Sequence, residues 1–376
     1  MAFGIFKKID RWIEQIPTFH ALNEAKKNAF QIPDFDPENQ RYIIFSDIHK
    51  GDGRDNDDFK HNELIYLKAL QYYLSQDYRL ILNGDIEELW EASYAGIRTR
   101  YGEKIFPSEA DFRKKGAEYY VRIFGNHDYE WKQPDNVKKI LLPDFGDIKA
   151  YEAAMLGNHI FIIHGHQGDP VDDPDRFKEV SVLVKIWGVY QRSWVKVRTM
   201  IGIKRPMASN NQDIRETRDR FLYEWAKQNQ LLLIAGHTHK AIFQSWTRTG
   251  QLQNELESMQ VNQIRARVNV DDVSQSAAEQ FLQHAIEVSP DDPAKDKARP
   301  VPCYFNSGCC LYENGITGIE ISGGQIRLIK WEITDSFCDG DEHVAHDPMT
   351  GYYIIRRIYQ MAYLSELFSA IDTQSA

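Results

Sequence analysis

The sequence contains little cysteine, no long apolar segment and no excess of basic residues. Its four cysteines among 376 residues lack Cys-x-x-Cys spacing and are too few for a disulfide framework, which predicts a reducing, cytoplasmic compartment. No run approaches the roughly 20 apolar residues of a membrane-spanning helix, and charged residues interrupt the N-terminal apolar segment, unlike a secretory signal. The formal net charge of -10 argues against a nucleic-acid-binding surface, so an anionic substrate would have to be attracted locally.

What remains is the composition of an ordinary soluble protein, long enough for one large α/β domain with insertions or for two domains. Residues 1–40 place apolar side chains from Phe3 to Ile16 at helical spacing before Pro33 and Pro37 end the pattern. This predicts an N-terminal amphipathic helix followed by a linker. The helix could pack on its own domain or lie on a membrane surface, which would give peripheral membrane contact.

From Arg41 onward, short apolar runs end in polar turns and alternate with helical segments such as Leu64–Leu74. The runs are Tyr42–Phe45, Leu80–Leu82, Val121–Phe124, Ile160–Ile163 and Leu231–Ala235. Strands that alternate with helices predict a mainly parallel sheet, whose ligands bind outside the carboxyl ends of the strands. We therefore expect the polar turns to meet at one edge of a domain that spans residues 41–335.

Two insertions interrupt this pattern, and a different segment closes the chain. Residues 168–230 carry an apolar stripe beside basic residues, typical either of a core-facing helix or of a cap over an active site. Residues 251–300 are polar and predict a solvated helical or partly disordered insertion. Closing strands are expected at Cys303–Ser307, Gly315–Ile321 and Ile326–Ile333. Residues 336–376 are expected to end in an amphipathic helix over Tyr352–Ile371 that packs on the domain.

The tetrapeptide Gly236-His-Thr-His239 follows one of the apolar runs. Side chains two residues apart lie on the same side of a strand, so His237 and His239 could bind metal, although a hydrogen-bonded histidine pair gives the same pattern. The other runs end in similar side chains, and half of the 12 histidines fall in these turns. Imidazole with carboxylate or amide oxygen suits Mn, Fe, Zn or Co, and the ligands suffice for two ions. The residues at the other strand ends are Asp47, His49, Asp85, Glu88, Asn126, His127, Asp128, His164 and His166.

These motifs resemble, in order, the D-x-H, G-D, G-N-H-[DE], H and G-H-x-H pattern of the calcineurin-like metallophosphoesterases, from Asp47 to His239. The resemblance implies an α/β fold of four layers, with two mixed β-sheets sandwiched together and flanked by helices. It also implies two divalent or trivalent metal ions, with Asp85 bridging them. The implied ligands are Asp47, His49, Asp85 and His239 for one ion, and Asp85, Asn126, His164 and His237 for the other.

The resemblance further implies that His127 is a catalytic histidine that binds no metal, and that Asp128 orients His127 or a neighbouring ligand. Four residues have weaker expectations. Glu88 fits the family's G-D-x-x-E form, or is merely a carboxylate in a helix first turn. His166 is expected to contact a ligand rather than the metal. Arg54 could bind a substrate phosphate or form a surface ion pair, and Asn306 could line the pocket.

The predicted activity is hydrolysis of a phosphomonoester, phosphodiester or pyrophosphate by a metal-activated hydroxide. Gly84-Asp-Ile-Glu-Glu-Leu-Trp90 departs from the protein phosphatase pattern Gly-Asp-x-Val-Asp-Arg-Gly. With the insertion over 168–230, it looks more like the UDP-diacylglucosamine pyrophosphohydrolases, which implies a small substrate that is nucleotide- or lipid-linked. The alternatives are a nuclease of the same superfamily and a catalytically silent interaction scaffold.

Overall fold

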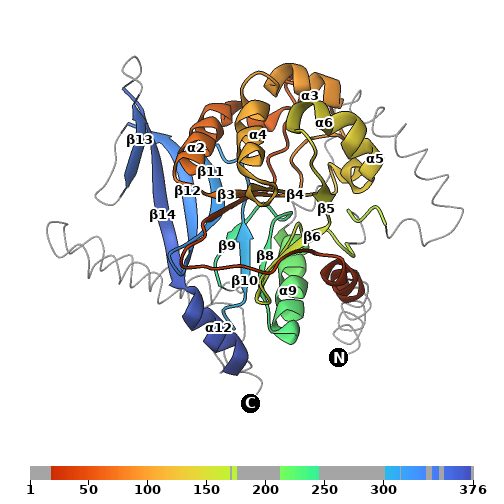
Figure 1. The fold of residues 1–376 in the computed structure, drawn as a ribbon, viewed down its shortest axis with the longest axis vertical. Helices are drawn as coiled ribbons and strands as arrows, with labels where there is room; N and C mark the ends of the chain where they lie inside the picture. The colour runs from red at the N-terminus through yellow and green to blue at the C-terminus, as the bar shows by residue number, and fades with distance from the viewer. Residues whose placement is uncertain are drawn as a thin grey trace, which may run out of the picture.

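The computed structural model describes residues 18–169, 172–175, 212–244, 301–313, 315–335, 341–346 and 351–373. Two mixed β-sheets lie at the centre of the fold (Figure 1). One has the strand order β1-β6-β7-β8-β10-β9, with bounds β1 Phe30–Ile32, β6 Ala153–Leu156, β7 Ile160–Ile163, β8 Leu232–Ala235, β10 Tyr304–Ser307 and β9 Ala241–Ile242. The other has the order β13-β14-β12-β11-β2-β3-β4-β5, with bounds β13 Glu342–His346, β14 Tyr353–Tyr363, β12 Gln325–Thr334, β11 Ile316–Ser322, β2 Tyr42–Phe45, β3 Arg79–Asn83, β4 Tyr120–Ile123 and β5 Ala150–Tyr151.

Helices cover the outer faces of both sheets. Those on the side of the eight-stranded sheet include α2 Glu63–Ser75, α3 Tyr94–Tyr101, α4 Ile105–Lys115, α5 Pro134–Asn136 and α6 Leu142–Phe145, with single turns η1 Asp58–His61, η2 Ala117–Tyr119, η3 Tyr129–Lys132 and η4 Val137–Leu141. Helix α9, Gln212–Asn229, packs on β8 and β10, and α12, Leu364–Asp372, contacts β8 and β14 (Figure 1). The expected architecture of two mixed sheets flanked by helices is confirmed. None of the described helices is both long and apolar enough to cross a bilayer.

The central strands are buried on both faces, which explains their continuous apolar runs. In β2, Ile44 joins the core between the sheets, whereas Ile43 and Phe45 join the core beneath the helices. Strands β2, β3 and β4 run parallel, as do β7, β8 and β10. The edge pairs β1–β6 and β4–β5 are also parallel, but each sheet contains antiparallel pairs too, so the sheets are mixed and the expected mainly parallel sheet is correct only in part. The parallel registers of the central strands bring the carboxyl ends within each sheet together.

The C-terminal prediction is wrong over half of its length. Residues 353–363 form β14, which pairs antiparallel with both β12 and β13, and only residues 364–372 are helical. Pairing with β12 along the strand, and with β13 at Tyr353–Arg356, satisfies much of the backbone of β14 and outweighs a side-chain pattern that is compatible with a helix. The predicted linker also contains β1, at the edge of the six-stranded sheet.

Several expectations fall outside the described residues. These are the apolar positions from Phe3 to Ile16, the insertion over 251–300 and most of the insertion over 168–230. The described C-terminal part of the latter insertion is helical, because it forms α9.

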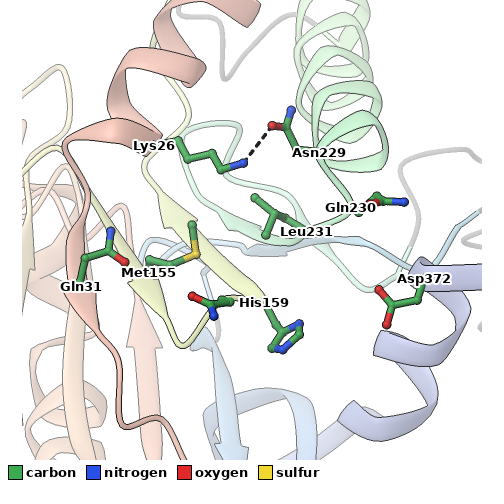
Figure 2. A pocket seen from close by; sticks show the side chains of 9 residues that line it. Lys26, Gln31, Met155, His159, Asn229, Gln230, Leu231 and Asp372 are labelled. Carbon is green, nitrogen blue, oxygen red and sulfur yellow. Dashed lines mark hydrogen bonds between the residues drawn. The ribbon is translucent and has the colours of Figure 1, made fainter. Parts of the chain in front are cut away.

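A cavity of about 450 Å³ opens at the amino ends of β7 and β8 (Figure 2). At its rim Lys26 donates a hydrogen bond of 3.1 Å to Asn229, as Figure 2 shows. His159, also in the lining, lies just before β7. The predicted ligands follow the opposite, carboxyl ends of these strands, so none of them lines this cavity. The complete lining is Lys26, Gln31, Met155, Asn158, His159, Asn229, Gln230, Leu231 and Asp372.

Candidate metal centre

The predicted ligands come together where the carboxyl ends of the two sheets meet. Three strands of the eight-stranded sheet and two of the six-stranded sheet supply them, each through the turn that follows the strand. The side chains are buried, except that His239 is 18% exposed. The contributing turns are those after β2 (Asp47, His49), β3 (Asp85), β4 (Asn126), β7 (His164) and β8 (His237, His239).

The backbone at five of these ligands is left-handed. The φ angles are 51° at Asp47, 50° at His49, 52° at Asp85, 68° at His237 and 56° at His239. Residues other than glycine rarely adopt this conformation, which costs on the order of 1–3 kcal/mol each and occurs preferentially at functional sites. Only three other non-glycine residues in the described chain share it. The fold therefore holds these residues in an unfavourable backbone conformation that orients their side chains toward the site.

Backbone hydrogen bonds hold the strained turns in place. The amides of Ile48 and His49 both donate to the carbonyl of Asp85, at 2.9 Å each, and thereby join the turn after β2 to the turn after β3. The amide of His237 lies 3.0 Å from each carboxylate oxygen of Asp47, which joins the two sheets. These bonds fix the ligand-bearing turns relative to one another.

Three motif glycines are required because other atoms occupy the space of a side chain. A Cβ at Gly84 would collide with the ring of His164, and one at Gly125 would collide with the carboxylate of Asp85. A Cβ at Gly236 would lie 2.6 Å from Asp47 Oδ2. Each glycine thus permits a ligand from another strand to approach its own backbone closely.

The first ligand set consists of Asp47, His49 and His239. His239 Nε2 lies 3.1 Å from Asp47 Oδ1 and 3.2 Å from His49 Nε2. His49 Nδ1 lies 2.8 Å from Glu88 Oε2, so the ring donates to this carboxylate and leaves Nε2 free to act as a ligand. Nε2 lone pairs from both rings beside a carboxylate oxygen form a donor set that suits a cation.

The second set consists of Asp85, His164 and His237. Asn126, from the Gly-Asn-His-Asp motif, is its fourth predicted member. His164 Nδ1 donates to the carbonyl of Asn83 at 2.9 Å, which directs Nε2 inward. Nε2 lies 3.2 Å from Asp85 Oδ2 but has no partner in hydrogen-bond geometry. His237 Nε2 and Asn126 Oδ1 are likewise buried without a hydrogen bond. Buried polar atoms rarely lack partners, and these three atoms are of the types that bind transition metals.

Asp85 belongs to both sets. Its Oδ2 lies 3.6 Å from His49 Nε2 and 3.2 Å from His164 Nε2, whereas Oδ1 accepts a hydrogen bond of 2.8 Å from the amide of His127. Asp85 could therefore contribute to both groups of candidate metal-binding side chains.

The carboxylates and imidazoles of the site shift one another's pKa values. Burial opposes ionisation of Asp85, but the charges of His164 and His127 outweigh it and lower the pKa of Asp85 well below its usual value. Burial also lowers the pKa of His49 and His164, yet Glu88 and Asp85 beside His49, and Asp85 beside His164, raise the pKa of both to about 9. Protonated histidines therefore balance the buried carboxylates. Bound cations would replace these protons, because metal ligation requires neutral imidazole.

Glu88 rather than Asp128 contacts the side chain of His127. Glu88 Oε2 lies 2.6 Å from His127 Nδ1 and also accepts from His49. Burial opposes ionisation of Glu88, but the charge and hydrogen bond of His127 lower its pKa to about 2. Asp128 instead accepts from the amides of Gly125, at 2.6 Å, and Ile86, at 2.8 Å. Asp128 therefore holds the turn after β4 against the turn after β3.

The other three predicted residues lie around this centre. His166 is buried, its Nδ1 has no hydrogen bond, and burial lowers its pKa well below the usual value. The side chain of Arg54 is 68% exposed and pairs with Asp52, as the surface ion-pair alternative requires. Asn306 donates a side-chain hydrogen bond of 2.7 Å to the carbonyl of Gly236 and thereby supports the Gly-His-Thr-His turn.

Two neighbours were missed by sequence reasoning. Trp90 stacks on His127, although only its place after the Gly-Asp motif could have signalled it. Asp172 Oδ2 lies 3.8 Å from His237 Nε2, and together with Asp169 these residues form a further cluster of metal-ligand type. The acidic residues after His166 are visible in the sequence, but they resemble an ordinary solvated turn.

Comparison with models of known protein families identifies the family of this chain. A family model described as calcineurin-like phosphoesterase matches residues 40–241, which include the turns after β2, β3, β4, β7 and β8. No curated protein matches the chain. The matched region covers more than half of the 376 residues and contains both ligand sets. The chain therefore belongs to the calcineurin-like phosphoesterase family.

Proposed function

We propose that the protein is a metal-dependent phosphoesterase that uses two cations to hydrolyse a small phosphomonoester, phosphodiester or pyrophosphate. One observation carries the proposal. A single carboxylate oxygen, Asp85 Oδ2, stands between His49 Nε2 at 3.6 Å and His164 Nε2 at 3.2 Å. Two ligand sets joined in this way, beside a histidine that belongs to neither, are suited to phosphoryl transfer to water.

Asp47, His49, Asp85 and His239 would hold one ion, and Asp85, Asn126, His164 and His237 the other. Mn, Fe and Zn all suit this mixture of nitrogen and oxygen donors. When bound, the ions supply Lewis acidity that lowers the pKa of water and neutralises phosphoryl oxygens. The protein contributes the fixed position of the donors, through the left-handed turns and the glycines packed against them.

His127 has the geometry of a general acid. Its Nδ1 faces Glu88, and the described residues provide no hydrogen bond to Nε2. As the oxygen of water bonds to phosphorus and the bond to the leaving oxygen breaks, His127 Nε2 would donate a proton to that oxygen. Glu88 would fix the orientation of the ring for this transfer through its contact with Nδ1.

The net charge of the chain and the motif after β3 guide the choice of substrates to test. The chain has a net charge of -10, so the ions rather than a basic surface would attract a phosphate group. The resemblance of the Gly-Asp-x-x-Glu-x-Trp turn to UDP-diacylglucosamine pyrophosphohydrolases makes nucleotide-linked lipids the first substrates to screen. Simple aryl phosphates and a single-stranded oligonucleotide belong in the same screen, because they separate a phosphatase from a nuclease.

The decisive experiment measures bound metal and hydrolysis together. Purified protein supplied with Mn²⁺ should bind about two ions per chain and hydrolyse an aryl phosphate ester. Asp85→Ala and His237→Ala should abolish hydrolysis, whereas His159→Ala, an exposed histidine beside the cavity of Figure 2, should leave it unchanged. Turnover like that of the wild type in either ligand variant would contradict the two-ion assignment. Wild-type protein without metal or activity would instead favour an interaction scaffold.

A further inference from the structure

The ring of His127 is enclosed on more than one side. Trp90 stacks on it with ring centroids 3.7 Å apart and planes inclined by 25°. The ring of His49 lies nearly perpendicular to it, with a centroid distance of 4.5 Å and an interplanar angle of 84°. Glu88 Oε2 contacts Nδ1 at 2.6 Å. Together these contacts leave Nε2 as the nitrogen available to a substrate.

We infer that Trp90 is a positioning residue for His127, an inference that rests on the general-acid role proposed above. The indole face sets the plane of the imidazole, while Glu88 sets its direction. Trp90 follows β3 within the turn that carries Asp85, so the ion ligand and the surface that orients the acid come from the same turn. The family match does not assign this role to Trp90.

A hydrogen bond at Nδ1 cannot orient the ring by itself. The second side-chain torsion of histidine has a broad energy profile, so a ring anchored at one atom can still rock about that contact. In addition, Glu88 Oε2 is shared between His127 and His49, at 2.6 and 2.8 Å. A flat surface in van der Waals contact restricts the rocking motion that the shared hydrogen bond permits.

Trp90 also acts on Glu88 through its backbone. The amide of Trp90 donates to Glu88 Oε1 at 3.2 Å, which leaves Oε2 to the two histidines. The turn itself is anchored, because the amide of Glu88 donates to the carbonyl of Lys50 at 3.0 Å and that of Ala92 to the carbonyl of Glu88 at 3.0 Å. A substitution of the indole therefore removes the stacking surface but retains this backbone bond. The side chain of Trp90 can be tested separately from the placement of Glu88.

The kinetic test uses Trp90→Leu and the aromatic variant Trp90→Phe in the metal-loaded protein. The substrates are phosphate esters whose leaving alcohols differ widely in pKa. Trp90→Leu should lower kcat about two- to tenfold for poor leaving groups, and less for p-nitrophenol, which needs little protonation. Trp90→Phe should restore most of the loss. Bound metal per chain should stay unchanged in both variants.

A double-mutant cycle tests whether Trp90 acts through His127. In a His127→Ala background, Trp90→Leu should have almost no further effect on kcat, because the ring that it orients is gone. An equal loss in both backgrounds, or a rise in KM with unchanged kcat, would overturn the inference and indicate direct substrate contact. If His127→Ala itself shows no loss, the general-acid assignment fails instead, and the two failures are thus distinguishable.

A measurement without turnover keeps the inference testable in any case. The imidazole resonances of His127, assigned by their loss in His127→Gln, should be shifted by the indole ring current in the wild-type protein. In Trp90→Leu these resonances should move and broaden as the ring becomes mobile, and in Trp90→Phe they should remain sharp. Resonances of His127 that are the same in the wild type and Trp90→Leu would refute the inference.

Discussion

A buried group of four charged residues lies directly behind the metal centre. Lys50, Glu87, Glu109 and Arg122 are all inaccessible to solvent. Lys50 Nζ lies 2.7 Å from Glu109 Oε1 and 3.4 Å from Glu87 Oε1, and Glu87 also pairs with Arg122. Two positive and two negative charges thus balance one another in a region that bulk solvent does not reach. Because Lys50 follows the ligand His49 directly, this network supports the turn after β2.

We predict that Glu109→Gln destabilises the protein by about 3–5 kcal/mol, the usual cost of stranding one partner of a buried ion pair. Glutamine retains the size of glutamate and can still accept the hydrogen bond that Tyr66 donates at 3.0 Å. The loss therefore comes from the charge and leaves Lys50 with only the more distant Glu87. The double variant Lys50→Met, Glu109→Gln should be more stable than Glu109→Gln alone, because it removes the stranded ammonium group.

Urea unfolding followed by circular dichroism measures these differences. Asp111→Asn, also in α4, is the matched control, because Asp111 pairs with Lys114 on the surface with side chains 43% and 71% exposed. Such a pair contributes about 0–1 kcal/mol. The reasoning is refuted if Glu109→Gln lies within about 1 kcal/mol of the wild type, or if the double variant is less stable than Glu109→Gln.

Two further predictions concern the supports of the ligands. Gly125→Ala should prevent metal binding with the secondary structure intact, because its Cβ collides with the carboxylate of Asp85; full metal content in this variant would contradict the steric argument. Asn306→Ala, which removes the 2.7 Å bond to the carbonyl of Gly236, should weaken metal binding about 10- to 100-fold in titrations with Mn²⁺. Unchanged affinity would exclude this support, and the exposed Asn158→Ala serves as the control.

The positions of the predicted ligands follow from the sequence because their signal is local. An apolar run that ends in Gly-Asp or Gly-His specifies both a buried parallel strand and the turn at its carboxyl end. The role of Glu88 is different. That it contacts His49 and His127 with one oxygen depends on how the turns after β2, β3 and β4 pack, which no spacing along the chain encodes. For the same reason the sequence motif that contains Trp90 did not reveal its contact with His127, and Lys50 carried no signal of its role.

The error at the C-terminus has a similar cause. Apolar residues such as Ile354, Ile355 and Ile358 recur at three to four residues, as on a helix. In β14, however, the side chain of Arg356 is almost buried because it pairs with Glu320 of β11. The ladder with β12 also shifts register between Leu328 and Ile329, which interrupts strict alternation. The buried charge and the bulge remove the alternating pattern that would identify β14 as a strand from its sequence. Its pairing with β12, which is distant in the sequence, determines its conformation.

The candidate metal centre lies between the two sheets and would contribute to their packing. Each ligand set takes residues from both sheets: His239 joins Asp47 in one, and His164 joins Asp85 in the other. Direct hydrogen bonds already link the sheets there, including one of 3.1 Å that the side-chain amide of Asn83 donates to the carbonyl of Ile163. Cations bound at this centre would cross-link the two sheets, so if they bind only the folded chain, every tenfold excess of metal over its Kd would stabilise the protein by about 1.4 kcal/mol. The dependence is reciprocal, because any substitution that shifts one sheet against the other changes the distances between ligands and weakens metal binding without touching a ligand.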